Sequence, residues 1–576
     1  MSLDEKSREE LYSAAAQWID GDPDPATREE MERFVAAESD EELADRLGAR
    51  LQFGTAGLRG AVGAGPNRMN RSVVIQATRG LAVHLLNQGG GTVVVGYDAR
   101  LSSRQFMEDT VGVLAAAGLT VRYFDVPTPT PLVAFAALRF DAIAAVVVTA
   151  SHNPPQDNGY KVYAANGAQI VPPDDILIAA EIDKVGPAAL VPRIRWSATA
   201  DSDLCSSLDA GPVFEQYLEA VHRPRPDTDR QPLRIVYTPL HGVGGYFTQA
   251  VLEYGGNEVV PVLTQSEPDG RFPTVDFPNP EEPGALDEAF AIAERDDSFD
   301  LIVANDPDAD RLSVSVPSES GWRALSGNQV GVLLADWCLD GGSASPAVFN
   351  SVVSSPMLGS IAAARGALWA TTLTGFKWIW NAALDLAPEY EFIMGYEEAL
   401  GYSVGPAVRD KDGISTALVF ADMAGAAKAQ GSTVLDRLAG LYREVGIWTS
   451  AQHSVRFEGA GGMDKIEPAL NALLDDPPTE LAGIAVTGIK DYRTGAEDRP
   501  RYLGATPLLE LDLGDSGRCL IRPSGTEPKL KIYVDLTEPT DLESTTEIMA
   551  AEAELQARGL IVAQAAAVAL GFSPPA

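Results

Sequence analysis

Along most of the chain, short apolar runs typical of buried strands alternate with segments whose apolar residues have helical spacing. Short runs of small and β-branched residues at 92–96, 144–148 and 301–304 are typical of strands buried on both faces. Between these runs lie segments with apolar residues at helical spacing, for example between residues 74 and 85. Repeated alternation of strand and helix predicts α/β domains with mainly parallel sheets.

The pattern changes along the chain in a way that predicts domain boundaries. The first fifty residues are rich in Glu, Ala and Leu at helical spacing and predict two or three amphipathic helices. A weakly patterned segment from Pro187 to about Leu208 is a candidate linker, and residues 541–570 predict a C-terminal helix. Three α/β domains and a final α+β domain are expected, at residues 1–205, 206–325, 326–447 and 448–576.

Composition narrows the class of protein and of partner. The 576 residues carry a formal net charge of −37, which disfavours nucleic acid and anionic membranes as partners. The sequence contains no run of 18 apolar residues, so a membrane span is not expected. The three cysteines, Cys205, Cys338 and Cys519, are far apart and favour neither a disulfide framework nor a zinc site. The acidic N-terminus lacks the apolar core of a signal peptide, so a cytoplasmic protein is expected.

A hydroxyl lies where the strand predicted at 144–148 ends. Ser151 is flanked by His152 and Asn153, and two prolines then prevent either a strand or a helix from continuing. This arrangement suits a nucleophile at the edge of a sheet, but an ordinary Ser/Asn/Pro turn explains the same residues. A serine hydrolase is disfavoured because no G-x-S-x-G elbow surrounds the serine.

Three carboxylates follow the apolar strand predicted at 301–304. An aspartate occupies every second position here, at Asp306, Asp308 and Asp310. Arg311 follows directly and could donate hydrogen bonds to an anion. Oxygen ligands at this spacing suit a hard divalent cation such as Mg²⁺. A calcium loop is disfavoured because its sixth position is Arg311 and its twelfth is Pro317. The alternative is a solvated acidic loop, which is common in a chain with 81 acidic residues.

Two later loops carry groups suited to a phosphate and to a sugar. The segment RPSGTEPK at 522–529 offers a guanidinium, two hydroxyls and backbone N–H groups to phosphate oxygens, although such a sequence is also found in ordinary turns. The segment GYEEALG at 395–401 places two carboxylates between glycines. Carboxylates pair well with sugar hydroxyls, but paired Glu also occurs where helices begin.

Taken together, these loops resemble the α-D-phosphohexomutase superfamily of phosphoglucomutases and phosphomannomutases. The motifs TASHNP, DPDADR, GYEEALG and RPSGTEPK occur in the order of that family and span nearly the whole chain. The long form GYEEALGY and the loop FGTAGLRG look most like the branch with phosphoglucomutases and phosphopentomutases. The resemblance implies four domains around a central cleft, three related α/β domains plus a C-terminal α+β domain.

The resemblance also implies a role for each motif. Ser151 would carry the phosphoryl group as phosphoserine and complete the site of one Mg²⁺ per chain. The implied metal ligands are Ser151, Asp306, Asp308 and Asp310, and the implied catalytic residues are Ser151, His152, Lys161 and Arg311. The implied substrate-binding residues are Arg59, Lys377, Glu397, Glu398, Arg522, Ser524, Gly525, Thr526 and Lys529. Ala399 stands where the family often has serine, which leaves the preferred sugar open.

The implied activity is that of a phosphosugar mutase, with glucose 1-phosphate and 6-phosphate as the first choice of substrate pair. A sugar bisphosphate would be both intermediate and activator, and Lys161 would be a general acid/base whose pKa is lowered by nearby positive charge. Mannose or pentose phosphates on the same mechanism, a metal-dependent sugar phosphatase and a non-catalytic sugar-phosphate binder are the alternatives. The expected state is a monomer or homodimer that binds small sugar phosphates.

Overall fold

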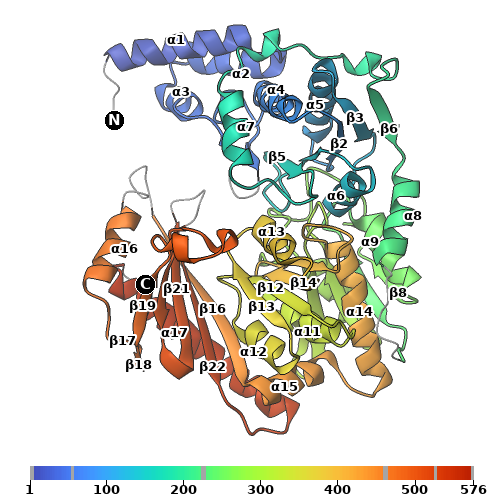
Figure 1. Cartoon of the computed structure of the whole chain (residues 1–576), viewed down its shortest axis with the longest axis vertical. Helices are drawn as coiled ribbons and strands as arrows, with labels where there is room; N and C mark the ends of the chain where they lie inside the picture. The colour runs from blue at the N-terminus through green and yellow to red at the C-terminus, as the bar shows by residue number, and fades with distance from the viewer. Residues whose placement is uncertain (1–4, 53–56, 222–228, 458–464, 524–528, 573–576) are drawn as a thin grey trace. The chain divides into compact units, whose positions relative to one another are not determined.

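The computed structural model describes residues 5–52, 57–221, 229–457, 465–523 and 529–572 (Figure 1). The chain forms two compact units. The first contains residues 1–223, 232–315 and 405–418, and the second contains residues 224–231, 316–404 and 419–576. Within the described ranges, no helix combines the length and the apolar character needed to cross a membrane.

The N-terminal segment forms three helices, as the sequence predicts. They are α1 (Glu5–Gly21), α2 (Pro25–Ala36) and α3 (Asp40–Leu47). Asp24 caps α2 by accepting a hydrogen bond from the backbone of Ala26, and Pro25 occupies the first helical position, where its missing N–H costs nothing. The helices pack around a small core that includes Met31 and Leu43.

The first sheet has six strands in the order β1-β5-β4-β2-β3-β6. Neighbours among β4, β2, β3 and β6 are parallel, whereas β5 is antiparallel to both β4 and β1. The strands are β1 (Leu58–Ala61), β2 (Thr92–Tyr97), β3 (Thr120–Phe124), β4 (Ala144–Val148), β5 (Asp157–Ala164) and β6 (Cys205–Leu208). Because β6 is an edge strand of this sheet, the C-terminal end of the predicted linker is ordered structure.

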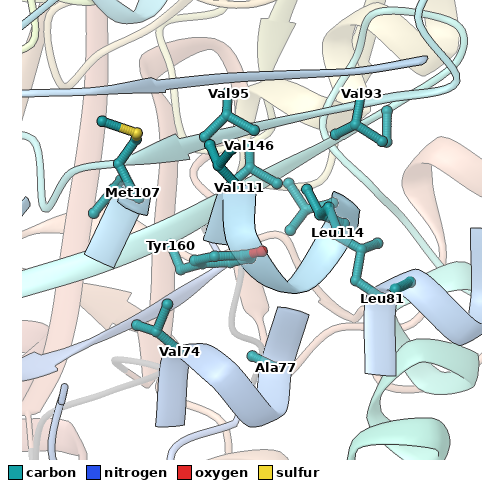
Figure 2. Packing of buried hydrophobic residues seen from close by; sticks show 14 of the residues in the cluster. Val74, Ala77, Leu81, Val93, Val95, Met107, Val111, Leu114, Val146 and Tyr160 are labelled. Atoms are coloured by element: carbon teal, nitrogen blue, oxygen red, sulfur yellow. The ribbon is translucent and has the colours of Figure 1, made fainter. Parts of the chain in front are cut away.

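Alternate residues of β2 and β4 enter two different cores, which explains why these strands are apolar on both faces. Val93, Val95 and Val146 pack against one set of helices, as Figure 2 shows, whereas Val94 and Val147 belong to the core on the other face. The helices on the first face are α4 (Arg71–Asn87), α5 (Ser103–Ala116) and α7 (Asp174–Ile182), and the second face packs against α6 (Thr130–Arg139) and α8 (Ala210–Val221).

The second sheet has the order β11-β10-β9-β7-β8. Its strands are β7 (Arg234–Thr238), β8 (Glu258–Pro261), β9 (Leu301–Ala304), β10 (Ser313–Ser318) and β11 (Gly321–Ala324), and its helices are α9 (Gly245–Tyr254) and α10 (Asp287–Ala293). Strands β7, β8 and β9 are parallel, and β10 turns back antiparallel to β9. The acidic run therefore lies in the turn that joins β9 to β10.

The third sheet has the order β13-β12-β14-β15, with β12 parallel to both β13 and β14. Its strands are β12 (Pro346–Ser351), β13 (Leu368–Thr372), β14 (Glu391–Glu397) and β15 (Gly401–Val404). The helices of this part of the chain are α11 (Gly327–Leu339), α12 (Met357–Ala364), α13 (Phe376–Leu386), α14 (Gly413–Ala429) and α15 (Val434–Val445).

The C-terminal sheet is entirely antiparallel, with the order β16-β22-β21-β20-β19. Its strands are β16 (Ile447–Arg456), β19 (Gly488–Asp491), β20 (Leu509–Asp512), β21 (Gly517–Pro523) and β22 (Lys529–Glu538), beside the short pair β17 (Glu480–Leu481) and β18 (Ile484–Ala485). Helix α17 (Thr545–Ala569) packs on β16 and β22, and α16 (Ile466–Asp475) completes this region. The predicted C-terminal helix and the change to an α+β domain are confirmed, while the three boundaries between the four domains stay a prediction.

Candidate active site

The acidic run forms a buried turn, not a solvated loop. The side chains of Asp306, Asp308 and Asp310 are fully buried, and each offers an oxygen within 4.8 Å of the others. Asn305 closes the turn by donating from Nδ2 to the Arg311 carbonyl oxygen over 2.6 Å. The turn between β9 and β10 therefore concentrates three carboxylates, whose mutual repulsion requires cationic partners.

Two lysines supply positive charge to these carboxylates. Lys161, on β5, donates from Nζ to Oδ2 of Asp308 and of Asp310 over 2.7 Å each, and the Lys411 Nζ lies 2.9 Å from the same Asp310 oxygen. Burial lowers the pKa of Lys161, but the charges of Asp308 and Asp310 outweigh burial and raise that pKa above its usual value. The expectation of a lowered pKa for Lys161 is therefore wrong in this arrangement, because the contacts of the ammonium are anionic.

The carboxylates themselves differ in proton affinity. Burial and repulsion from Asp310 and Asp308 raise the pKa of Asp306 well above its usual value. Burial and the charge of Asp310 also act to raise the pKa of Asp308, but Lys161 lowers it below its usual value. Burial likewise opposes ionisation of Asp310, yet Lys161, Lys411 and Arg311 hold its pKa well below the usual range. Lys161, Lys411 and Arg311 therefore favour the anionic form of Asp308 and Asp310, whereas Asp306 has the highest proton affinity of the three.

The donor set fits a hard divalent cation. Oδ1 of Asp308 and Oδ1 of Asp310 are buried and have no hydrogen-bond partner among the described residues. A buried carboxylate oxygen without a donor is costly in an uncharged environment, and a divalent cation relieves that cost through direct oxygen coordination. The residues at this turn therefore suit a metal ion such as Mg²⁺, which prefers carboxylate oxygens.

Ser151 reaches the carboxylate turn directly from the end of β4. Its Oγ donates to Asp306 Oδ2 over 2.5 Å and lies 3.2 Å from His152 Nδ1. The backbone at Ser151 has φ +51°, in the left-handed region that non-glycine residues rarely adopt. Desolvation and the charges of Arg311 and Arg59 hold the pKa of His152 well below its usual value, so the imidazole is neutral at pH 7.

Arg311 and Arg59 add positive charge beside the same groups. Arg311 Nε lies 3.9 Å from Asp306 Oδ2 and 3.9 Å from Asp310 Oδ1, while the Arg59 Nη1 donates to Asn153 Oδ1 over 3.4 Å. A strongly acidic protein needs such a local concentration of cations to hold an anionic phosphate. The first unit provides this concentration around Ser151.

The predicted sugar-binding residues are found in the second unit. Glu397 Oε1 accepts a hydrogen bond from the Gly375 backbone over 2.7 Å, just before α13, and the buried Lys377 lies in the first turn of that helix. Glu398 Oε2 accepts from Ser351 Oγ at 3.2 Å and from Ser354 Oγ at 2.9 Å.

The predicted phosphate loop joins two neighbouring strands of the second unit. Arg522 lies near the end of β21, and Lys529 begins β22, which is paired antiparallel with β21. Ser524, Gly525 and Thr526 lie outside the described residues.

Comparison with known families decides the classification. Models of the phosphoglucomutase/phosphomannomutase family match the chain over residues 50–188 (alpha/beta/alpha domain I), 215–319 (domain II), 326–443 (domain III) and 478–555 (C-terminal domain). The chain belongs to the phosphoglucomutase/phosphomannomutase family. It is therefore an enzyme, a sugar-phosphate mutase of the isomerase class, and the fold class predicted from the sequence is confirmed.

Relatives of this mutase cover most of its length. A Haemophilus influenzae protein named "Probable phosphomannomutase" is 40% identical over 481 residues, which are 81% of this chain and 93% of that protein. The "Phosphopentomutase" of Homo sapiens is 34% identical over 580 residues, covering 92% of each. A solved structure of a phosphoglucomutase/phosphomannomutase family protein from Burkholderia thailandensis has the same fold, with 21% identity, a TM-score of 0.63 and coverage of 89% and 98%.

Lys411 is a further candidate residue of the mutase. It lies in the segment 405–418, which belongs to the first unit although it follows β15 of the second. Its neighbour Asp410 accepts hydrogen bonds from Tyr163 Oη (2.6 Å) and Gln169 Nε2 (2.7 Å), which fix the backbone next to Lys411. A Cβ at Gly413 would lie 2.2 Å from the Arg311 carbonyl oxygen, so only glycine allows this close approach to the carboxylate turn.

Arg100 is a residue that the sequence analysis did not single out. Its guanidinium is buried and donates to the carbonyl oxygens of Ser151 (2.8 Å), Asn153 (2.5 Å), Pro154 (2.7 Å) and Asp157 (2.9 Å). The planar fork of arginine suits several carbonyl acceptors at once, which lysine cannot reproduce. The sequence signal was a charged residue three positions after the end of β2.

Replacing Arg100 with methionine should lower kcat by about 10²-fold, because small misplacements of reacting groups carry penalties of that size. Four carbonyl oxygens, one of them in a fully buried hydrogen bond, would lose their donor, so the unfolding free energy should also fall by about 3 kcal/mol. Steady-state kinetics and thermal denaturation measure both effects. Arg104→Met is the matched control, since Arg104 is exposed on α5 and, within the described residues, forms its hydrogen bond and ion pair with Glu108 of the same helix. Equal kinetics for the two variants would contradict this role of Arg100.

Proposed function

We propose that this mutase interconverts glucose 1-phosphate and glucose 6-phosphate through a phosphoserine at Ser151. The observation that carries the proposal is the contact of the buried Ser151 Oγ with Asp306 of the carboxylate cluster. A hydroxyl at a metal-binding set of carboxylates, with Arg311 and two lysines nearby, suits transfer of a phosphoryl group.

The proposed transfer needs no reactant other than the phosphoserine and the sugar phosphate. The bond between phosphorus and Ser151 Oγ breaks, a bond between phosphorus and a sugar hydroxyl oxygen forms, and the hydroxyl proton is returned to Oγ. The product is a sugar bisphosphate, and the reverse transfer of its other phosphoryl group to Ser151 yields the isomer. Asp306, Asp308 and Asp310 would hold one Mg²⁺ per chain, which neutralises charge on the transferring group.

Each remaining residue has a proposed role. Arg311 and Lys411 stabilise negative charge on the phosphoryl group, and neutral His152 orients Ser151 Oγ. Glu397 accepts hydrogen bonds from sugar hydroxyls, with Glu398 and Lys377 supporting substrate recognition. The distal phosphate is assigned to the loop between β21 and β22, and the proposed residues are Arg522, Ser524, Gly525, Thr526 and Lys529. Arg59 contributes charge for the reacting phosphate.

Lys161 is the proposed general acid/base. Lys161→Met should lower kcat by about 10²-fold, the typical contribution of a positioned proton donor, because the raised pKa of Lys161 keeps it protonated and able to donate. Lys184→Met is the control, because Lys184 is exposed and its ion pair in the described part of the chain is with Glu181. Normal turnover of Lys161→Met across the pH range would remove Lys161 from the mechanism.

A coupled assay tests the proposed substrate. Glucose 1-phosphate, mannose 1-phosphate and ribose 1-phosphate are each supplied with a trace of the matching bisphosphate, and kcat/KM is compared. Glucose 1-phosphate is expected to give the highest value. Inorganic phosphate is measured in parallel, since release faster than isomerisation would favour a metal-dependent phosphatase instead.

Pentose phosphate is the second candidate substrate. Relatives named phosphopentomutase or phosphoribomutase match 91–92% of this chain at 34–35% identity. A higher kcat/KM for ribose 1-phosphate than for glucose 1-phosphate would reassign the substrate while keeping the mechanism.

A further inference from the structure

The two adjacent glutamates after β14 make different contacts. Glu397 accepts from the Gly375 backbone, whereas Glu398 is held in a reciprocal pair with Ser354. Ser354 Oγ donates to Glu398 Oε2 over 2.9 Å, and the Glu398 backbone N–H donates to the same Oγ over 3.0 Å. Because Glu398 is fixed at both its backbone and its carboxylate, the position of Ser354 sets the position of the adjacent Glu397.

Ser354 is in turn held from the C-terminal sheet. Arg518, on β21, donates from Nη2 to the Ser354 carbonyl oxygen over 2.7 Å and from Nε to Asp535 Oδ2 over 2.8 Å. Asp535, on β22, is almost completely buried, and its Oδ1 accepts from Ser450 Oγ over 2.6 Å. The guanidinium is thus fixed by a buried carboxylate while it binds the Ser354 carbonyl oxygen.

A second chain of hydrogen bonds reaches the next residue of the same loop. Ser450 Oγ accepts from Asn328 Nδ2 over 2.9 Å, and Asn328 Oδ1 accepts from the Ser355 backbone N–H over 2.9 Å. The Ser355 carbonyl oxygen accepts from Asn350 Nδ2 over 2.9 Å. A buried network in which the polar groups have hydrogen-bond partners favours one side-chain arrangement over alternative arrangements.

We propose that Arg518 and Asp535 are positioning residues for sugar recognition, acting through Ser354 on Glu398 and Glu397. Arg518 precedes Arg522 by four residues on β21, so the strand that carries Arg522 also fixes Ser354 and, through it, Glu398. This inference rests on the proposed function, and it predicts that loss of Arg518 weakens sugar-phosphate binding.

The test compares two variants of the network with a matched control. Arg518→Gln and Ser354→Ala should each raise the KM for glucose 1-phosphate, and the Kd for glucose 6-phosphate measured by calorimetry, about tenfold. Arg323→Gln is the control, because Arg323 on β11 also binds the C-terminal part of the chain, through a 2.5 Å ion pair with Glu552 on α17, and makes no hydrogen bond to Ser354 or Ser355 within the described residues. All variants are also measured by thermal denaturation.

Each outcome decides the inference. The positioning role is supported if both arginine variants have a lower melting temperature but only Arg518→Gln binds the sugar phosphate more weakly. It is also supported if the double variant Arg518→Gln/Ser354→Ala weakens binding by less than the sum of the two single effects. Unchanged KM and Kd in Arg518→Gln would overturn it and leave only a structural role. If Arg518→Gln does not fold, unchanged binding by Ser354→Ala overturns it equally. A wild-type protein that binds the sugar phosphate without isomerising it would contradict the proposed function instead, and one that neither binds nor isomerises would overturn both.

Discussion

Ser151→Ala should lower mutase turnover by at least about 10⁴-fold, because the variant lacks the oxygen that accepts the phosphoryl group and removal of a covalent nucleophile has effects of this size. The loss should appear in kcat with every sugar phosphate, since the same serine acts in both half-reactions. Intact-protein mass spectrometry after incubation with glucose 1,6-bisphosphate should show one added phosphoryl group on the wild type and none on Ser151→Ala.

Stability should change little, which separates this effect from unfolding. Ser151 lies outside the strands, and its hydroxyl contacts only Asp306 and His152 among the described side chains. Because φ at this position is +51°, Ser151→Gly should be about 1 kcal/mol more stable than Ser151→Ala while equally inactive. Ser315→Ala is the control, since Ser315 is a buried serine on β10 whose hydroxyl has no partner in the described structure. Retained turnover or phosphorylation in Ser151→Ala would exclude Ser151 as the carrier.

Asp308→Asn should lower turnover by about 10³-fold and weaken Mg²⁺ binding in parallel, because a neutral amide oxygen is a weaker ligand than a carboxylate. Asp308 Oδ2 also accepts from Thr130 Oγ1 over 2.8 Å and from Lys161, so an amide NH₂ at that position would oppose the Lys161 ammonium. Calorimetric titration with Mg²⁺ measures binding independently of turnover, and EDTA treatment of the wild type should abolish activity until Mg²⁺ is restored.

A control on the same part of the chain separates this effect from the general loss of one negative charge. Asp297→Asn removes one charge from an exposed position near α10 and should change neither Mg²⁺ affinity nor turnover. Unaltered Mg²⁺ affinity in Asp308→Asn would show that the carboxylate turn is held by its lysines alone and does not bind the metal.

The local sequence was sufficient to predict the strands and helices whose apolar pattern is visible within a short segment. The apolar runs at β2, β4 and β9 predicted buried strands, and the structure confirms that both faces of β2 and β4 are covered. The Asp306–Asp310 spacing predicted a shared metal-binding turn, and the three carboxylates do converge. Helical spacing likewise predicted the N-terminal helices and α17.

Contacts between distant segments could not be inferred in the same way. Arg100 and the loop after Ser151 are about fifty residues apart, and Lys411 reaches Asp310 from a segment of chain that follows β15. The periodicity of these segments does not predict that they contact each other. Lys161 shows the same limit for electrostatics, since the sign of its pKa shift depends on which charges lie within hydrogen-bond reach.

The sequence by itself determined the α/β elements, the order of the chemical motifs and the residue types available for phosphoryl transfer. Only the tertiary structure decided that the carboxylates are buried, that Ser151 Oγ meets Asp306, and that Glu398 is held from β21 through Arg518. The physical reason is that periodicity reports which face of an element is buried, whereas burial, pKa and partner choice depend on what the other segments place against that face.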